Sequence, residues 1–493
     1  NAQLIASSIN FQELERIFTS STGLGQGAIV DFMECLSNVA KFELIGEIVS
    51  GENGESSSTS NQSSGQAEPR VFSLQKLVEM ADYNMNIRPR VVWARLWSHI
   101  SSLFEDVGAH PNMLIAMYAI DSLKQLGVKF LERTELSHFQ FQRVFMQPFD
   151  KIMNKNPNQE IRELVLSVIN NIIQLRHSNI MSGWKVIFSV YSAAAADQSA
   201  ALNTSSFNAM AKLIEEHWEL VYPNFVDIIN CFASFAKNMH HEKTSLSAIA
   251  QILRLTDKLV QGTNDIRCDE HGALLSLAQQ QEAINDSSGA NGESTALSTA
   301  LSTASSEAET KQEHRFTDSA DHSRVWFPIL TCLANLVVDE RAAVRKAALY
   351  GLFQILNNQG HAFSPSLWEL IFKGVLFPIF DDVRHSEVVL TERLDPETNR
   401  FIKAWLDTTC QDALNMLVGL FETPERYSTL SFLLTDVMKL VRSCIVHPSK
   451  LLARKGVVCL QQLLVESGRL FPENVWDQVC TNMVSSIVVV VIL

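Results

Sequence analysis

The side chains best suited to contact a partner form a basic and aromatic cluster early in the chain. Arg88, Arg90 and Arg95 alternate with Trp93 and Trp97. The two tryptophans are four residues apart and share one helix face, whereas the arginines project to a different face, where they would meet an acidic protein or anionic headgroups. In the alternative interpretation, both tryptophans belong to the core of a helical array and the arginines form its solvated rim. The sequence leaves both interpretations open.

Polar residues of the preceding helical tract invite the same comparison. Gln75, Tyr83 and Asn84 precede Pro89, a residue that suits the first position of a helix. They either specify a partner or satisfy backbone groups where the first helix ends.

An acidic pair lies far from this cluster in the sequence. Asp381 and Asp382 directly follow an apolar run at 375–380 and precede Arg384 and His385. These residues form either an acidic docking edge or an exposed turn with a surface ion pair.

Catalytic and cofactor-binding motifs are not recognisable in this sequence. It contains no GxSxG elbow, no P-loop and no HExxH pair, and its only glycine-rich echo, at residues 23–27, has the wrong spacing and no preceding strand. Cys268 and His271 lack the second pair of ligands that a zinc site needs. We therefore expect no cofactor, no metal and no enzymatic activity of this region alone. A self-standing enzyme with an unrecognised site is the least favoured hypothesis.

Length and composition favour an elongated helical protein. At 493 residues the chain exceeds the size at which a single core stops growing, and it has 46% hydrophobic residues with only 20 Gly and 13 Pro. The net charge of −14 argues against nucleic-acid binding. Eight scattered cysteines suit reduced, cytosolic thiols. No apolar run reaches membrane-spanning length, and both ends look like cuts through a longer polypeptide.

Two polar segments divide the chain. Residues 51–70 are rich in Ser and Gly and predict a flexible insertion after an N-terminal helical segment at 1–50. Residues 281–322 contain a tandem Ser-Thr-Ala-Leu repeat and predict a second, low-complexity insertion.

A helix, a short polar turn and a second helix recur within the remaining blocks. In the clearest copy, residues 325–356, the second helix carries Val344, Ala348, Leu352 and Ile355 at spacings of four and three. Further copies lie at 145–175 and 430–464, and their arginines at 162 and 454 align with Arg345. A helix pair of this kind buries its apolar face only against neighbouring pairs. We therefore predict an all-α protein, a HEAT/armadillo-like α-solenoid of stacked antiparallel helix pairs.

The amino-acid sequences of several tracts resemble those of one protein family. Residues 71–149 are similar to the tract that opens the helical regions downstream of the catalytic domain in large Golgi Arf guanine-nucleotide exchange factors, of the trans-Golgi, brefeldin-inhibited branch. The resemblance continues in order along about nine-tenths of the chain. It implies a first downstream homology region at 71–200, a second at 201–280 and a third at 323–493. The motif residues that carry it include Phe72, Gln75, Tyr83, Asn84, Trp93, Trp97, Trp184, Trp326 and Arg345.

This resemblance implies a non-catalytic regulatory function in vesicle trafficking. The family's glutamate finger and its FNxxPKxGI loop do not occur in these residues, so nucleotide exchange is not assigned to them. The expected roles are recruitment to Golgi membranes, binding of the GTP form of an Arf-family GTPase and of Rab-family GTPases, autoregulation and homodimerisation. The expected location is cytoplasmic, peripheral on Golgi or trans-Golgi membranes. The candidate residues for contact with a partner or a membrane are Arg88, Arg90, Arg95, Asp381 and Asp382.

A second hypothesis is a generic HEAT-repeat scaffold or transport adaptor. Such a protein would bind a peptide or another solenoid with no preference for a nucleotide state. The two interpretations of the basic cluster also differ in their mutants. Trp93→Ala is expected to loosen the first block if Trp93 is core, and Arg95→Glu is expected to spare folding and weaken binding if the arginines contact a partner.

Overall fold

A computed structural model describes most of the chain, at residues 11–49, 70–132, 135, 140–262, 320–381 and 396–480. Nearly all of the insertions predicted at 51–70 and 281–322 lies outside the described residues, as do Cys268, His271 and Asp382. Every regular element in these ranges is a helix, which confirms the all-α prediction. The described helices fall into two compact units that divide between residues 221 and 222. The boundaries of the three homology regions stay a prediction.

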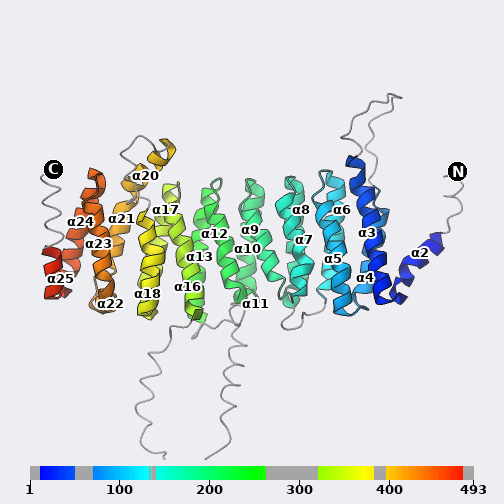
Figure 1. Cartoon of the computed structure of the whole chain (residues 1–493), viewed down its shortest axis with the longest axis horizontal. Coiled ribbons are helices and arrows are strands. Elements are labelled where there is room, and N and C mark those ends of the chain that lie inside the picture. Colours follow the sequence, from blue (N-terminus) through cyan, green and yellow to red (C-terminus); the bar gives the residue numbers. More distant parts are fainter. Residues whose placement is uncertain are drawn as a thin grey trace, which may run out of the picture. The chain divides into compact units, whose positions relative to one another are not determined.

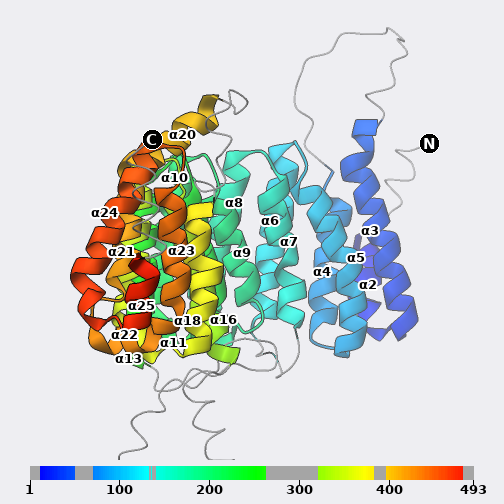
Figure 2. The same cartoon turned by 60° about the vertical axis from the view of Figure 1, so that its left-hand side comes forward.

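The first unit consists of two rows of helices (Figures 1 and 2). One row contains α3 (Gln26–Val49), α5 (Arg90–Gly108), α7 (Phe141–Lys155) and α9 (Trp184–Ala195), and the other contains α4 (Phe72–Met85), α6 (Met113–Phe130), α8 (Gln159–Arg176) and α10 (Ala200–Glu216). Each helix of the first row pairs with the next helix in the chain. The short elements α2 (Phe11–Thr19), η1 (Ser20–Gly23), η2 (His177–Asn179) and α11 (Trp218–Val221) complete the unit.

The second unit repeats this scheme with more interruptions. Its long pairs are α12 (Phe225–Lys237) with α13 (Glu242–Gly262), α16 (Ala320–Val337) with α17 (Ala342–Gln359), and α23 (Leu434–Ile445) with α24 (Lys450–Ser467). Further helices lie before, between and after them: η3 (Tyr222–Asn224), η4 (Gly360–Ala362), α18 (Pro365–Ile371), η5 (Phe372–Leu376), η6 (Phe377–Phe380), α20 (Pro396–Thr408), α21 (Cys410–Gly419), α22 (Pro424–Leu430), η8 (Ser431–Leu433), η9 (Gly468–Leu470) and α25 (Glu473–Gln478). The predicted stacking of helix pairs is thus confirmed.

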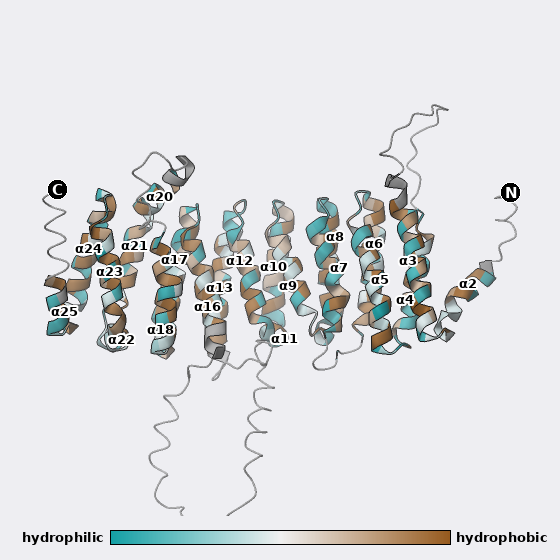
Figure 3. Cartoon of the chain, viewed as in Figure 1, coloured by the Kyte–Doolittle hydropathy of each residue, from teal (hydrophilic) through white to brown (hydrophobic). Residues whose placement is uncertain are grey.

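The predicted helical periodicity corresponds to the buried faces. On α17, Val344, Ala348 and Leu352 are fully buried and Ile355 is 4% exposed. On α8, the residues at 161, 165, 168 and 172 are buried, whereas Leu164 is only half-buried. Figure 3 shows the resulting mixture of hydrophobic and hydrophilic residues along the helices of each unit.

One turn design recurs between paired helices. The first turn residue accepts a hydrogen bond through its side chain from the backbone N–H two residues later, which starts the second helix. The acceptors are Asn, Asp or the Nδ1 atom of His, in the pairs His110 with Asn112, Asn156 with Asn158, Asp197 with Ser199, Asn238 with His240, Asp339 with Arg341 and His447 with Ser449. The polar turns seen in the sequence are therefore one structural motif built from different residues.

Arginines on the second helix of a pair brace these turns. The guanidinium of Arg162 donates to the carbonyls of Asn156 and Pro157, and that of Arg345 donates to Asp339 and Glu340 at 2.8 and 2.7 Å. Both arginines therefore reach back five and six residues. Arg454, aligned with them in the sequence, is exposed instead, so the predicted equivalence holds for two of the three positions.

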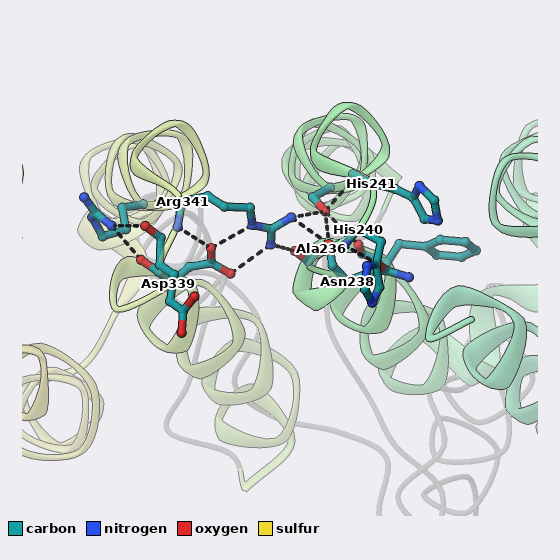
Figure 4. A network of polar contacts seen from close by, with 10 residues as sticks. Ala236, Asn238, His240, His241, Asp339 and Arg341 are labelled. Atoms are coloured by element: carbon teal, nitrogen blue, oxygen red, sulfur yellow. Dashed lines mark hydrogen bonds and ion pairs between the residues drawn. The ribbon is translucent and has the colours of Figure 1, made fainter. Parts of the chain in front are cut away.

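Neighbouring turns are also linked to each other. In the first unit, Asn156 donates to the Gly108 carbonyl at 2.8 Å. In the second, the Arg341 guanidinium binds both carboxylate oxygens of Asp339 at 2.8 Å. It also donates to the carbonyls of Ala236 and Asn238 at 2.8 and 2.6 Å (Figure 4). These bonds fix the spacing of successive pairs within each unit.

Candidate partner-binding site at the start of helix α5

The basic and aromatic cluster lies where α4 ends and α5 begins. Pro89 takes the N-cap position with φ −56° and ψ 146°, and Arg90 is the first helical residue. The sequence placed Pro89 one position later, inside the helix. Proline disfavours helical backbone at the residue before it, so the chain leaves α4 ahead of Arg88 and re-enters a helix only after Pro89.

Arg88 is bound within the unit. Its guanidinium donates to the carbonyls of Leu24, Ser21 and Thr22 at 2.7, 2.8 and 3.1 Å. Its Nε donates to Asn84 Oδ1 at 2.8 Å. Asn84 is fully buried and donates in turn to Ser21 Oγ and the Met80 carbonyl. Both side chains therefore anchor the loop before α3 to the end of α4, which is the backbone-satisfying role considered for Asn84.

Both tryptophans lie in the core. Trp93 is 6% exposed and Trp97 is 2% exposed. The Trp97 ring stacks on Phe145 at 4.1 Å between centroids, and its Nε1 donates to the Val144 carbonyl at 3.2 Å. Phe145 stacks in turn on Phe130 at 4.2 Å. This aromatic column joins α5 to α6 and α7, so Trp97 is a core residue that holds α5 and its arginines in place. Trp93 is also largely buried but lines a neighbouring pocket.

A small pocket opens beside Arg90. Its volume is about 110 Å³, which is roughly that of one medium-sized side chain. Hydrophobic groups of Met85, Trp93, Phe130 and Phe141 line it, together with the polar residues Asn86, Arg88, Arg90, Glu135 and Gln142. The lining combines apolar residues with two arginines.

The far wall of this pocket is rigidly held. Gln142 is 2% exposed, donates to the Asn179 carbonyl at 2.7 Å and accepts from the Met181 N–H at 2.7 Å. The carboxylate of Glu135 accepts from the backbone N–H groups of Gln142 and Ser182 at 2.9 and 3.1 Å. The turn before α9 therefore shapes the pocket.

The end of that turn is tightly packed at Gly183. A Cβ atom on Gly183 would lie 2.9 Å from Met146 Sδ and 3.4 Å from Gln142 Oε1. Trp184 follows this glycine, and its ring is 1% exposed and packs on Phe188.

The other predicted residues of this region do not join the pocket lining. Arg95 is exposed on α5, five residues after Arg90 and therefore about 140° further around the helix. Gln75 is exposed, and Tyr83 and Phe72 are 37% and 44% exposed on α4. Phe72 packs its ring edge against Phe18 and lies 5.8 Å from the Lys76 ammonium. The structure thus brings together Arg88, Arg90 and Trp93 only.

The candidates of the second unit have mostly buried surroundings. Trp326 is fully buried against Phe363. Arg345 is 1% exposed, and besides its turn it donates to the hydroxyls of Thr409 and Thr408 at 3.0 and 2.9 Å. Burial lowers the pKa of the Arg345 guanidinium, while nearby Asp339 raises it. Asp381 is half-buried at the end of η6, and its neighbour Asp382 lies outside the described residues.

The described ranges contain no set of ligands for a metal ion. No group of three or more His, Cys, Asp or Glu side chains there is arranged to hold an ion. Among the described cysteines, Cys35 and Cys480 are exposed and five are buried. Burial raises the pKa of Cys332 to about 11 and that of Cys410 to about 12, so these thiols stay protonated. Within the same ranges, no helix is long and apolar enough to cross a membrane.

The pocket is suited to recognition. An apolar side chain fits its hydrophobic lining, and carboxylates flanking that side chain would meet Arg90. The sequence pattern indicated the arginines and Trp93 as candidates but did not indicate Met85, Phe130, Glu135, Phe141 and Gln142. The aromatic and polar tract at 139–145 could have pointed to the last two of these residues, but its proximity to α5 depends on tertiary packing.

Comparison with known proteins first defines a class. Residues 129–212 match the family model described as Mon2/Sec7/BIG1-like, HDS, and residues 278–418 match the one described as C-terminal region of Mon2 protein. The first match contains Glu135 and Gln142 of the pocket lining, helices α7 to α9 and most of α10. Residues 129–212 therefore form an HDS-type group of helix pairs.

Full-length relatives identify the family more closely. Brefeldin A-inhibited guanine nucleotide-exchange protein 2 of Arabidopsis thaliana is 35% identical over 493 residues, covering 96% of this chain and 25% of that protein. Brefeldin A-inhibited guanine nucleotide-exchange protein 1 of Homo sapiens is 32% identical over 472 residues, covering 95% of this chain and 22% of that protein. The chain belongs to this family, as the resemblance in its sequence indicated, and spans about a quarter of the length of these relatives.

Proposed function

We propose that this chain is the non-catalytic regulatory region of a large Arf guanine-nucleotide exchange factor. The observation that carries the proposal is the similarity, along almost the whole chain, to a quarter of proteins named for guanine nucleotide exchange. The HDS match and the stacked helix pairs support a binding function for this part.

The proposed partner is an Arf-family GTPase in its GTP form. A site that fits only the ordered switch loops of that form would shift the exchange factor towards its membrane-bound population. Positive feedback would follow if the bound Arf is the product of the same exchange factor. Recruitment to trans-Golgi membranes, autoregulation, homodimerisation and contacts with Rab-family GTPases belong to the same proposal.

Cosedimentation tests the nucleotide preference. The purified chain is mixed with anionic liposomes that carry Arf loaded with GTP or GDP, and liposomes without Arf serve as the control. Retention with Arf-GTP alone is expected. Equal retention in both states would favour the second hypothesis, a generic scaffold or transport adaptor.

We place the contact at the pocket beside Arg90. Arg90→Glu reverses the charge at the rim of the pocket and is expected to reduce retention on Arf-GTP liposomes by roughly tenfold or more, because a charged pair at an interface contributes a few kcal/mol. The matched variant is Arg95→Glu, which makes the same charge change about 140° around the helix.

The pair of variants separates the two faces of α5. Loss of retention with Arg90→Glu only would support a contact at the pocket. Loss with Arg95→Glu only would place the contact on the face of α5 that carries Arg95. Unchanged retention of both would contradict a contact at the start of α5. Circular dichroism melts of both variants verify that folding is intact.

A further inference from the structure

A polar groove lies between α8 and α10, away from the residues that line the Arg90 pocket. Its volume is about 490 Å³. From α8, Glu163, Ser167, Asn170, Asn171 and Gln174 line it, and from α10, Ser205 does. Leu166 and Leu202, which are 3% and 1% exposed, add apolar surface to the lining.

The lining chemistry narrows the class of ligand. No Lys or Arg stands among the described lining residues, so a phosphate or another strong anion would find no counter-charge. No aromatic side chain lines the groove either, so bases and sugar rings would have no stacking surface there. The remaining groups are mostly neutral amides and hydroxyls, which offer both donors and acceptors.

One of these amides is oriented by the core. The hydroxyl of Tyr191, which is 1% exposed on α9, donates to Asn170 Oδ1. The NH₂ group of Asn170 takes no part in this bond, and Asn170 lines the groove, so the amide keeps a donor for a carbonyl oxygen of a ligand. Asn171 and Gln174 form no hydrogen bond with other described residues, so their amides remain available to a ligand.

The lining residues of α8 also have a suitable spacing. Residues 163, 167, 170, 171 and 174 recur every three or four positions and therefore share one helix face. They extend along roughly 16 Å of the helix, which equals about five residues of an extended chain.

We propose that this groove binds an extended polypeptide segment of a partner protein through the partner's backbone amides and carbonyls. Asn170, Asn171 and Gln174 would pair with successive peptide groups, and the apolar lining would accept one small side chain. This site is independent of GTPase binding at α5 and has its own test.

Selection from a peptide library tests the proposal. A phage library of random 12-residue peptides is selected on the whole chain and depleted on the Asn171→Ala/Gln174→Ala variant. A selected peptide is then synthesised with a fluorescent label, and its Kd is measured by anisotropy. The double variant is expected to weaken its binding about fivefold or more, because each amide contributes one or two hydrogen bonds.

Matched variants locate the contact. Asn170→Asp keeps the acceptor for Tyr191 and replaces the donor NH₂ by a carboxylate oxygen, so it is also expected to weaken binding. Asn208→Ala removes an exposed amide of α10 outside the groove lining and is expected to leave the Kd unchanged. Thermal melts monitor the folding of every variant.

A modified peptide tests the role of the backbone. Methylation of every backbone nitrogen removes the peptide's backbone donors and leaves its side chains intact, and it is expected to abolish binding. Equal binding of the methylated peptide, or failure of the selection to yield any peptide that distinguishes the wild type from the double variant, would overturn the proposal. Neither result would affect retention on Arf-GTP liposomes.

Discussion

Single side chains in the turns decide how each helix pair is held. At equivalent positions of different turns, the side chain of Asn, Asp or His accepts a hydrogen bond from the backbone N–H two residues later. All three side chains can do so because they offer an acceptor atom at a similar distance from the backbone. The three residues differ in the pH at which protonation removes the acceptor. Only the imidazole of His is protonated, and so loses its acceptor nitrogen, near neutral pH.

His110 is therefore expected to make folding sensitive to acid. It is 8% exposed, and its Nδ1 accepts from the Asn112 N–H at 3.0 Å. Burial lowers the pKa of His110 in the folded chain, so below the ordinary value of about 6.5 the unfolded chain binds more protons. The stabilisation is present above pH 6.5 and is lost as the pH falls through the folded pKa.

The His110→Asn variant tests this account. Asparagine keeps the acceptor, as at Asn156, and should remove the contribution of His110 to the loss of unfolding free energy between pH 7.5 and 5, measured in urea titrations. The control is His240→Asn, which changes an exposed histidine at another turn. An acid sensitivity of His110→Asn equal to that of wild type would refute the proposed role of the ring.

Arg345 is the residue whose loss should destabilise the second unit most clearly. Alanine at this position would leave the carbonyls of Asp339 and Glu340 and two threonine hydroxyls without their donor. We expect Arg345→Ala to lower the unfolding free energy by roughly 2–4 kcal/mol. Urea denaturation followed by circular dichroism measures this change.

The control lies at the aligned position of another pair. Arg454→Ala removes an exposed arginine and should change the unfolding free energy by less than about 0.5 kcal/mol. Equal effects at the two positions would mean that the bonds of Arg345 to its turn do not stabilise the unit.

At the scale of elements, glycines set how closely two helices approach. On α24, a Cβ atom at Gly456 would lie 2.9 Å from the backbone N of Ile445 and 3.1 Å from Cys444 Cβ at the end of α23. Backbone atoms of a packed helix cannot move aside as a flexible side chain can. The α23–α24 pair therefore depends on glycine at this position.

Two alanine substitutions measure this dependence. Gly456→Ala is expected to destabilise the second unit by about 1–3 kcal/mol, because overpacking forces the helices apart. Gly419→Ala, where nothing lies within 4 Å of the added atom, should be neutral or slightly stabilising. Thermal melts compare the two, and equal melting temperatures would contradict the close packing of α23 and α24.

At the scale of the whole molecule, net charge limits how the chain meets membranes. A net charge of −14 repels anionic headgroups, and the two exposed arginines of α5 are too few to offset this repulsion. We infer that a protein partner supplies most of any membrane attachment.

Sedimentation with vesicles that lack Arf tests this inference. With vesicles containing about a third of anionic lipid, the chain should remain in the supernatant at both 50 and 150 mM salt, because lower salt strengthens repulsion as well as attraction. Retention at 50 mM salt that disappears in Arg90→Glu would instead indicate direct contact between the α5 pocket and lipid.

The sequence alone was sufficient to predict the helices, the recurrence of helix pairs and the family. These follow from local patterns, such as Val344, Ala348, Leu352 and Ile355 on one face, which any stacked pair must bury. Pro89 was expected at the first position of the helix and is its N-cap instead, because cap positions depend on atomic geometry.

The roles of the individual arginines, in contrast, depend on tertiary packing. Arg88 and Arg90 are neighbours of similar appearance in the sequence, yet the carbonyls that bind Arg88 lie 64 to 67 residues earlier in the chain. The walls of the Arg90 pocket and the two sides of the α8–α10 groove likewise come from separate helices. A guanidinium satisfies whichever acceptors the fold brings within reach, and those acceptors are set by packing between segments that no local pattern connects.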